Sequence, residues 1–277
     1  MKKTKFVLIA LIASIVTISC SSDDDSSGGQ EETLKLVKTE KASDNLKIDY
    51  QYNDNGLLTK ATAIYPNFGY ESVFTYDSDK NLTKWEFEET GNFPATSTYT
   101  FLYDSEGRLS QYDNAAEITT FSYSGNIVTI EDNTQTTAEL ELNGNGLITK
   151  FTEATQYTVF GYDSNGNMIS AESFDNNDEP LTSFTITYDN KVNPFYGQFK
   201  SIYLERFIEF FWEFDGIYIS GFEGYSFPYS RNNITSIKEN NVEIASYTYS
   251  YDSEDFPLNV DEDYDGDIFN YELEYTR

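Results

Sequence analysis

A short turn motif recurs along most of this chain. Its full copies begin at Tyr52, Tyr76, Tyr103, Leu142 and Tyr162, and a shorter one begins at Tyr123. In the full copies Asp or Asn follows the first residue, Gly stands four positions after it and an apolar residue six positions after it. Asp and Asn bond backbone groups two residues ahead, and Gly adopts positive φ without steric cost. Each copy therefore predicts a chain reversal. Because Lys80 stands where Gly is expected, we expect that turn to differ in detail.

The spacing of the motif predicts hairpins. Copies start at residues 52, 76, 103 and 123, which is 24, 27 and 20 residues apart. Two strands and two turns fit into about 20–27 residues. Between the turns, aromatic residues alternate with polar ones, as with Phe101 and Tyr103, so they lie on one face of a strand. The sequence predicts an all-β fold, an antiparallel meander of repeated β-hairpins forming one large curled or barrel-like sheet, and leaves open whether the sheet closes.

Composition supports strands over helices. The 23 tyrosines and 21 phenylalanines suit pleated, half-buried surfaces. The segment at residues 207–212 has some helical character, but its run of Phe210, Phe211 and Trp212 and the following residues 217–219 favour buried strands. The 277-residue length suits one domain with a real core, which we place at residues 34–277.

The N-terminus resembles a bacterial lipoprotein signal. Three lysines precede an apolar run at residues 6–18, which is too short to span a membrane and fits a signal peptide over residues 1–19. The run ends beside Cys20, the chain's one cysteine, as in a lipobox, although Thr17 stands where leucine is usual. We expect Cys20 to be lipidated and to be the contact with the membrane. The alternative is an ordinary signal peptide with a stray cysteine.

An acidic tether follows the lipobox-like segment. Residues 20–33 are rich in Ser, Gly and acids, which predicts a flexible linker. Residues 21–25, Ser-Ser-Asp-Asp-Asp, resemble the export signal that sends Bacteroidota lipoproteins to the outside of the outer membrane. The resemblance implies an outer-membrane lipoprotein facing the cell exterior, and the alternative is a plain solvated linker.

The repeat itself resembles the YD repeat of Rhs-type proteins. Three later segments, residues 188–195, 232–235 and 249–257, are similar to a family of Bacteroidota surface lipoproteins with a porin-like β fold. The resemblance covers about residues 34–277 and implies a fold and a location but no activity. Rhs toxins build large shells and cleave themselves near an aspartate motif. This chain is far too short for such a shell and contains no such motif.

Charge and the amino-acid inventory exclude several functions. A net charge of −29 repels nucleic acids and anionic lipid surfaces, so we expect no nucleic-acid partner. Without histidine and with one cysteine, the chain lacks His-based triads, Cys/His metal sites and internal disulfides. We therefore expect a non-catalytic binding or scaffold protein with a glycan or protein ligand. The alternatives are a carbohydrate-active hydrolase using a carboxylate pair and an acyl carrier with a half-barrel cavity.

One local pattern matches a calcium loop. Acids at Asp261, Asp263 and Asp265, Gly266 at the sixth position, Asp267 and a closing Glu272 reproduce the spacing of an EF-hand loop. The flanks read as strands rather than helices, so a solvated hairpin turn is the alternative. Calcium is the one cofactor that the sequence suggests.

A second segment interrupts the repeat. Residues 195–229 are rich in aromatic residues, which predicts core that closes or plugs the sheet, with an exposed platform for a sugar or peptide as the alternative. The same choice applies to Trp85 and Trp212, for which we favour the core. A transmembrane barrel is the structural competitor, and the charges of Lys84, Glu86 and Glu88 argue against a lipid-facing band.

Overall fold

The computed structural model describes residues 35–91, 94–133, 137–212, 227–264 and 266–276. Backbone contacts separate residues 1–33 from a compact unit of residues 34–277. The predicted signal peptide, Cys20 and the whole predicted tether lie outside the described residues. No helix in the described ranges is long and apolar enough to cross a membrane.

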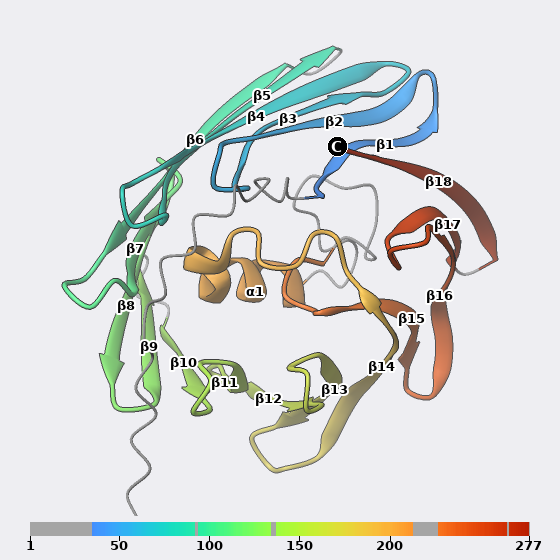
Figure 1. The fold of residues 1–277 in the computed structure, drawn as a ribbon. Helices are drawn as coiled ribbons and strands as arrows, with labels where there is room; N and C mark the ends of the chain where they lie inside the picture. Colours follow the sequence, from blue (N-terminus) through green and yellow to red (C-terminus); the bar gives the residue numbers. More distant parts are fainter. Residues whose placement is uncertain (1–34, 92–93, 134–136, 213–226, 265, 277) are drawn as a thin grey trace, which may run out of the picture. The chain divides into compact units, whose positions relative to one another are not determined.

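Eighteen antiparallel strands of the described chain form one closed barrel (Figure 1). Each strand pairs with the next in sequence, and β1 also pairs with β18, which removes both sheet edges. The predicted all-β meander is confirmed, and the barrel is closed rather than open. The strands are β1 (Val37–Ser43), β2 (Leu46–Tyr52), β3 (Leu58–Ile64), β4 (Phe68–Tyr76), β5 (Leu82–Gly91), β6 (Ala95–Tyr103), β7 (Leu109–Asp113), β8 (Ile118–Ser124), β9 (Ile127–Asp132), β10 (Thr137–Leu142), β11 (Ile148–Thr152), β12 (Gln156–Tyr162), β13 (Met168–Asp175), β14 (Pro180–Val192), β15 (Asn232–Glu239), β16 (Val242–Tyr251), β17 (Pro257–Tyr264) and β18 (Asp267–Tyr275).

The full copies of the motif all form the same turn. Between β6 and β7 the Asp104 carboxylate accepts hydrogen bonds from the N–H groups of Glu106, at 2.8 Å, and Arg108, at 3.0 Å. Gly107, at φ 75°, donates its N–H to the Asp104 carbonyl. The same side-chain bonds occur in the turns at 53–57, 77–81, 143–147, 163–167 and 252–256. Because successive strands run in opposite directions, these turns lie at one end of the barrel, called here the turn rim.

The turn at 77–81 keeps this geometry, so the expected difference at Lys80 is wrong. Lys80 adopts φ 69° and donates its N–H to the Asp77 carbonyl at 3.2 Å. A lysine thus occupies the left-handed conformation that glycine occupies in four of the other turns. In this conformation the Cβ of a non-glycine residue causes steric strain of about 1 kcal/mol.

Tyrosine hydroxyls join each unit of the repeat to the preceding one. Tyr103 donates its hydroxyl to the carbonyl of Leu82, the apolar residue that opens the second strand of the preceding unit, at 2.7 Å. The same bond joins Tyr76 to Leu58, Tyr123 to Leu109, Tyr162 to Ile148, Tyr188 to Met168 and Tyr275 to Pro257. In the Tyr-Asp pair, the Asp therefore builds the turn and the Tyr locks neighbouring hairpins together.

Removal of one such hydroxyl should have a measurable cost. We expect Tyr76→Phe to lower the free energy of unfolding by about 1 kcal/mol, because the carbonyl of buried Leu58 loses a donor. Urea unfolding followed by circular dichroism measures the change. Tyr196→Phe, at a side chain that is 46% exposed, is the control and should change stability little. Equal effects of both variants would refute the role of the hydroxyl.

The turn aspartates should make stability depend on acid. The backbone N–H of Arg108 and the Arg108 side chain hold the pKa of Asp104 below its ordinary value, and the N–H groups of Glu179 and Asn177 do the same for Asp175 in the β13–β14 turn. A pKa lowered by folding stabilises the fold above the unfolded-state pKa. This stabilisation disappears as the pH falls through the lower folded-state value.

We therefore expect D104N/D175N to lose less stability than the natural chain as the pH falls below about 4. Asparagine keeps the turn, since Asn53 and Asn143 make the same backbone bonds. Urea unfolding at a series of pH values measures the slope. Parallel stability curves for the two proteins would contradict the expectation.

The connection between β14 and β15 enters the barrel (Figure 1). It forms the 3₁₀ turn η1 (Lys200–Ile202) and the helix α1 (Tyr203–Trp212), so the predicted strand at residues 207–212 is wrong. Buried Leu204 and Phe207 and half-buried Ile208 are three to four residues apart, which places them on one helical face. Residues 217–219 lie outside the described residues.

The helix and its flanks fill the barrel. A closed sheet of this many strands encloses more space than its own side chains fill. The connection supplies Phe195, Phe199 and Phe207, all 5% exposed or less, and their rings lie 5.9, 4.8 and 5.0 Å from Tyr50, Phe74 and Phe160. The core interpretation of the aromatic segment is confirmed for these residues and Phe227, whereas Tyr196 is exposed.

The two faces of the barrel wall differ in polarity. Along β5, Trp85 packs against the core beside Phe74 and Tyr99, while Lys84 and Glu86 form an ion pair on the other face. This agrees with the predicted core position of Trp85. The side chain of Trp212 lies outside the described ones. On this strand the apolar residues thus face inward and the polar residues outward.

Candidate functional site

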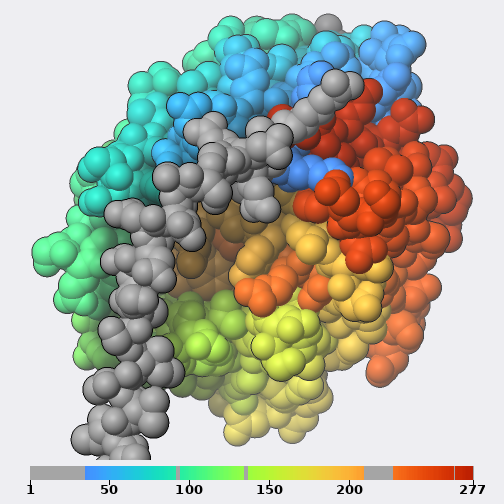
Figure 2. Space-filling model, viewed as in Figure 1, coloured from blue at the N-terminus to red at the C-terminus, as the bar shows by residue number. Residues whose placement is uncertain are grey.

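A hollow of about 610 Å³ lies at the turn rim. It is bounded by the turns at 77–81 and 104–108 on the barrel wall and by residues 197–204 of the connection. Figure 2 shows this end hollowed between the wall and the connection. Much of the lining is apolar or aromatic, with Leu57, Leu109, Leu142, Leu204, Tyr76 and Tyr123. Its volume is typical of small-molecule pockets, which are about 300–1,000 Å³.

The floor of the hollow is fixed to the barrel by hydrogen bonds. Gln198 accepts the N–H of Leu58 at 3.0 Å and donates its amide to the Gly56 carbonyl at 2.9 Å. Ser201 accepts the N–H of Leu82 at 3.0 Å, and the Tyr203 hydroxyl accepts that of Ile148 at 3.2 Å. The connection therefore caps the first residues of three strands, and the hollow is preformed.

The polar lining is mainly basic. Lys80, Arg108 and Lys200 line the hollow with a single acid, Asp79. The Arg108 guanidinium lies 2.7 Å from the Asp104 carboxylate and 4.2 Å from the centre of the Tyr123 ring. Arg108 is thus already neutralised and oriented, whereas the two lysines are exposed.

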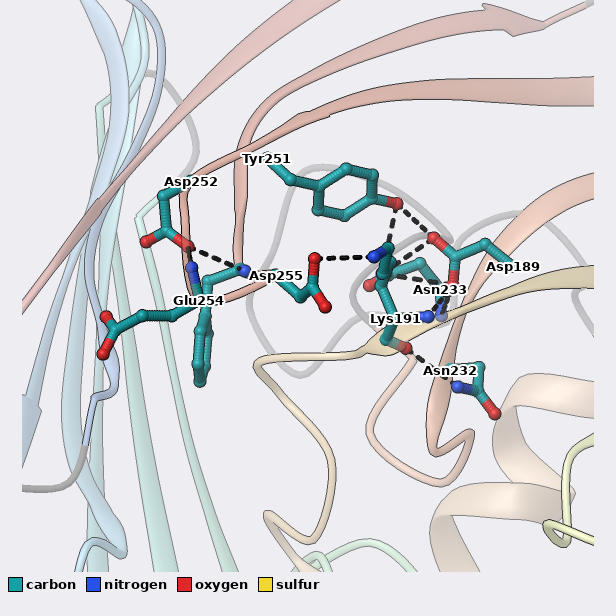
Figure 3. A network of polar contacts seen from close by, with 9 residues as sticks. Asp189, Lys191, Asn232, Asn233, Tyr251, Asp252, Glu254 and Asp255 are labelled. Carbon is teal, nitrogen blue, oxygen red and sulfur yellow. Dashed lines mark hydrogen bonds and ion pairs between the residues drawn. The ribbon is translucent and has the colours of Figure 1, made fainter.

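A second polar cluster connects β14, β15 and β16 (Figure 3). The Asp189 carboxylate accepts the Tyr251 hydroxyl, the N–H of Lys191 at 2.9 Å and the N–H of Asn233 at 3.1 Å. Burial and the bond to Asp189 raise the pKa of Tyr251. Lys191 in turn pairs with Asp255 at 2.6 Å. This cluster holds together the strands from which the connection departs, so its role is structural.

The turn at 252–256, which carries Asp255, also holds the segment just before β1 in place. Lys35 forms ion pairs with Asp252 and Glu254, and its ammonium lies 4.6 Å from the centre of the Phe256 ring. Figure 3 shows Asp252 and Glu254 on the turn that also carries Asp255. The acids of this region therefore already have cationic partners within the chain.

Two buried carboxylates lie in the barrel wall. Glu40 on β1 accepts the Tyr50 hydroxyl at 2.6 Å, and Glu262 on β17 accepts that of Tyr271 at 3.3 Å. Burial and then the Glu40 charge raise the pKa of Tyr50. Strand β18 separates β1 from β17, so the two acids are not on neighbouring strands. Neither of them lines the hollow.

The calcium-loop pattern lies on a β-hairpin. Asp261 and Asp263 are on β17, Asp267 and Glu272 are on β18, and Asp265 lies outside the described residues. Asp261 pairs with Asn270 across the hairpin and accepts its amide at 2.6 Å. Across the described ranges, no three Asp, Glu, His or Cys side chains gather as metal ligands. Calcium binding at this loop stays a prediction.

The sequence alone does not show that the basic residues Lys80, Arg108 and Lys200 line a common hollow. Lys80 carried a signal, since it replaces the motif's glycine, but Arg108 and Lys200 looked like ordinary surface residues. Their proximity follows from the insertion of the connection into the barrel, which no local pattern encodes.

Comparison with known structures finds low-identity likenesses of the fold. A porin-like protein from Bacteroides uniformis is 13% identical with a TM-score of 0.48, covering 88% of this chain and 97% of that one. A porin-like protein from Bacteroides vulgatus is 11% identical with a TM-score of 0.38, covering 87% and 99%. The TcdB2-TccC3 structure is 12% identical with a TM-score of 0.30, covering 83% of this chain and 10% of that one.

A family model matches the repeat region itself. None of the curated proteins matches the sequence. The Teneurin YD-shell model matches residues 67–217, which are 151 of 277 residues (217 − 67 + 1). This match confirms the YD-like nature of the repeat, while membership of a Bacteroidota lipoprotein family stays a prediction. The chain belongs to the Teneurin YD-shell family.

Proposed function

We propose that this protein is a lipid-tethered, cell-surface binding protein without catalytic activity, and that its ligand occupies the hollow at the turn rim. The observation that carries the proposal is the preformed hollow of about 610 Å³, with its apolar and aromatic lining and its hydrogen-bonded floor. Such a hollow binds a small molecule or a single unit of a glycan or peptide chain. The family itself fixes a fold and not an activity.

The placement of the acids favours binding over hydrolysis. A carboxylate pair for glycoside hydrolysis must flank one substrate bond. The lining of the hollow contains one acid, Asp79, and the buried Glu40 and Glu262 lie in the wall with tyrosine partners. The leucine-rich lining favours, as a second candidate, the acyl-carrier version of a binding function.

A neutral apolar dye tests the binding proposal. We expect N-phenylnaphthylamine to bind the purified protein saturably, with one site per chain. Hydrogen exchange should then slow in peptides covering residues 77–82 and 104–109 and stay unchanged in turns at the opposite end, such as 64–68. Failure to bind, or protection away from the turn rim, would refute the site.

The proposed location depends on Cys20. The outward charges of the wall, such as Lys84 and Glu86, support a wall that faces water, so that the anchor rather than the barrel provides membrane attachment. We expect Cys20→Ser to abolish incorporation of labelled fatty acid and to release the protein from outer membranes. Protease treatment of intact cells tests whether the natural protein faces the exterior. A Cys20→Ser protein that stays in the membrane fraction would refute the anchor.

A further inference from the structure

Backbone strain and unpaired charge coincide at the hollow. Seven described non-glycine residues have positive φ, and two of them, Lys80 and Phe199, line it. Phe199 is 5% exposed and packs against Phe74, so core contacts offset its strain. Lys80 is exposed and has no such packing. A strained residue that persists without a structural reason points to function.

The other turns show what normally accompanies a non-glycine residue at this position. Asp255 takes the same place in the turn at 252–256, with φ 67°, and forms an ion pair with Lys191. Asp178, at φ 64° in the β13–β14 turn, accepts the Tyr157 hydroxyl at 2.7 Å. In both turns a side-chain contact that glycine could not make accompanies the strain. The Lys80 ammonium has no hydrogen bond or ion pair with any described residue.

A second lysine shares this situation. Lys200, on η1 of the connection, also lines the hollow and forms no ion pair within the described ranges. Arg108, the third basic residue of the lining, is held by Asp104 and Glu106. In a chain of net charge −29, two lysines without acidic partners at one small cavity form a local positive site.

We propose that the hollow binds an amphiphile with a hydrocarbon body and one anionic head group, a carboxylate or a phosphate. The leucine and tyrosine lining takes the body, and the ammonium groups of Lys80 and Lys200 bind the head group. This inference rests on the proposed function, since it names the ligand class of the same site. The Lys80 ammonium, which has no partner among the described residues, pairs with the head group of the ligand. This contact explains why a lysine stands at a position where glycine would avoid the backbone strain.

Two dyes that differ in one group test the charge preference. Anilinonaphthalene sulfonate carries an anion on the scaffold of the neutral N-phenylnaphthylamine. We expect the purified full chain to bind the sulfonate more tightly. Lys80→Gly and Lys200→Gln should each weaken sulfonate binding by about threefold, and the double variant by about tenfold, without changing binding of the neutral dye. Lys238→Gln, at an exposed lysine on β15, is the control and should change neither.

Lys80→Gly should also change thermal stability, in the direction opposite to its effect on ligand affinity. Removal of the left-handed strain should raise Tm by about 1–3 °C while ligand affinity falls. If Lys80 had only a structural role, its replacement would not raise Tm and lower ligand affinity at the same time. Competition by dodecanoate and by dodecyl phosphate then tells a carboxylate from a phosphate head group, and dodecanol should compete least.

The outcomes separate the two proposals. If the neutral dye binds at the turn rim but the sulfonate binds no better, or the lysine variants leave sulfonate binding unchanged, the anionic head group is refuted and the binding function stands. If neither dye binds, both proposals are refuted. Stronger sulfonate binding by Asp79→Asn, which removes the one acid of the lining, would add support.

Discussion

Replacement of Phe207 by alanine is expected to lower the free energy of unfolding by about 4 kcal/mol. Phe207 lies on α1 and is 4% exposed. Its ring meets Phe160 of the barrel wall edge-on at 5.0 Å and Tyr203 of its own helix at 5.5 Å. Because the surrounding wall is a closed hydrogen-bonded ring, it can contract little around the missing side chain, so the cavity should remain and add to the cost.

Urea unfolding followed by circular dichroism measures this cost, and Ile169→Ala provides the control. Ile169 lies on β13 with its side chain 39% exposed, so its truncation removes apolar atoms without opening a cavity. We expect a change below about 1 kcal/mol there. If Phe207→Ala costs no more than Ile169→Ala, the helix does not contribute to the core, and the floor of the hollow loses its support.

The local chemistry of the repeat explains why its turns and strands could be predicted. The Asp104 turn needs only residues 104–108, so each copy reveals itself in sequence. Closure of the barrel could not be predicted in this way. It depends on the pairing of β1 with β18, where Glu40 stands opposite Leu273, and no short segment encodes that contact.

The helix shows how local signals can compete. Residues 203–208 carry apolar side chains at helical spacing around Glu205 and Arg206, but the run of aromatic residues at 210–212 suggests a buried strand. Glu205 is 3% exposed and pairs with Arg206, whose guanidinium lies 5.1 Å from the centre of the Trp85 indole. The helical spacing is therefore present in the sequence, and the aromatic run at 210–212 competes with it.

Three segments singled out by resemblance meet in the structure. Asp189 comes from residues 188–195, Asn233 from 232–235 and Tyr251 from 249–257, and they form the cluster of Figure 3. The sequence could flag these segments but not their purpose, because the contacts join positions up to 62 residues apart. Together they hold the base of the connection, that is, the place where it leaves β14 and returns to β15.

Asn193→Leu tests whether hydrogen bonds at the base of the connection hold it in place. Asn193 is 2% exposed and donates its amide to the carbonyls of Phe227, at 2.7 Å, and Ser230, at 2.9 Å, while its side-chain oxygen accepts the N–H of Phe195 at 2.9 Å. Leucine has a similar size but no polar atoms. It leaves three buried backbone groups without these partners, at a cost of about 1–3 kcal/mol each. We expect a loss of about 4 kcal/mol in urea unfolding, near the ceiling for single substitutions.

Asn176→Leu provides the matched control, since Asn176 is exposed and makes one hydrogen bond, to the Ala154 carbonyl at 3.0 Å. It should cost less than about 1 kcal/mol. The two variants should differ in binding as well, because Asn193 fixes both ends of the connection whose residues 197–204 floor the hollow. A folded Asn193→Leu protein should therefore bind N-phenylnaphthylamine more weakly, while Asn176→Leu binds it normally. Unchanged stability and binding in Asn193→Leu would mean that the connection holds its place without this base.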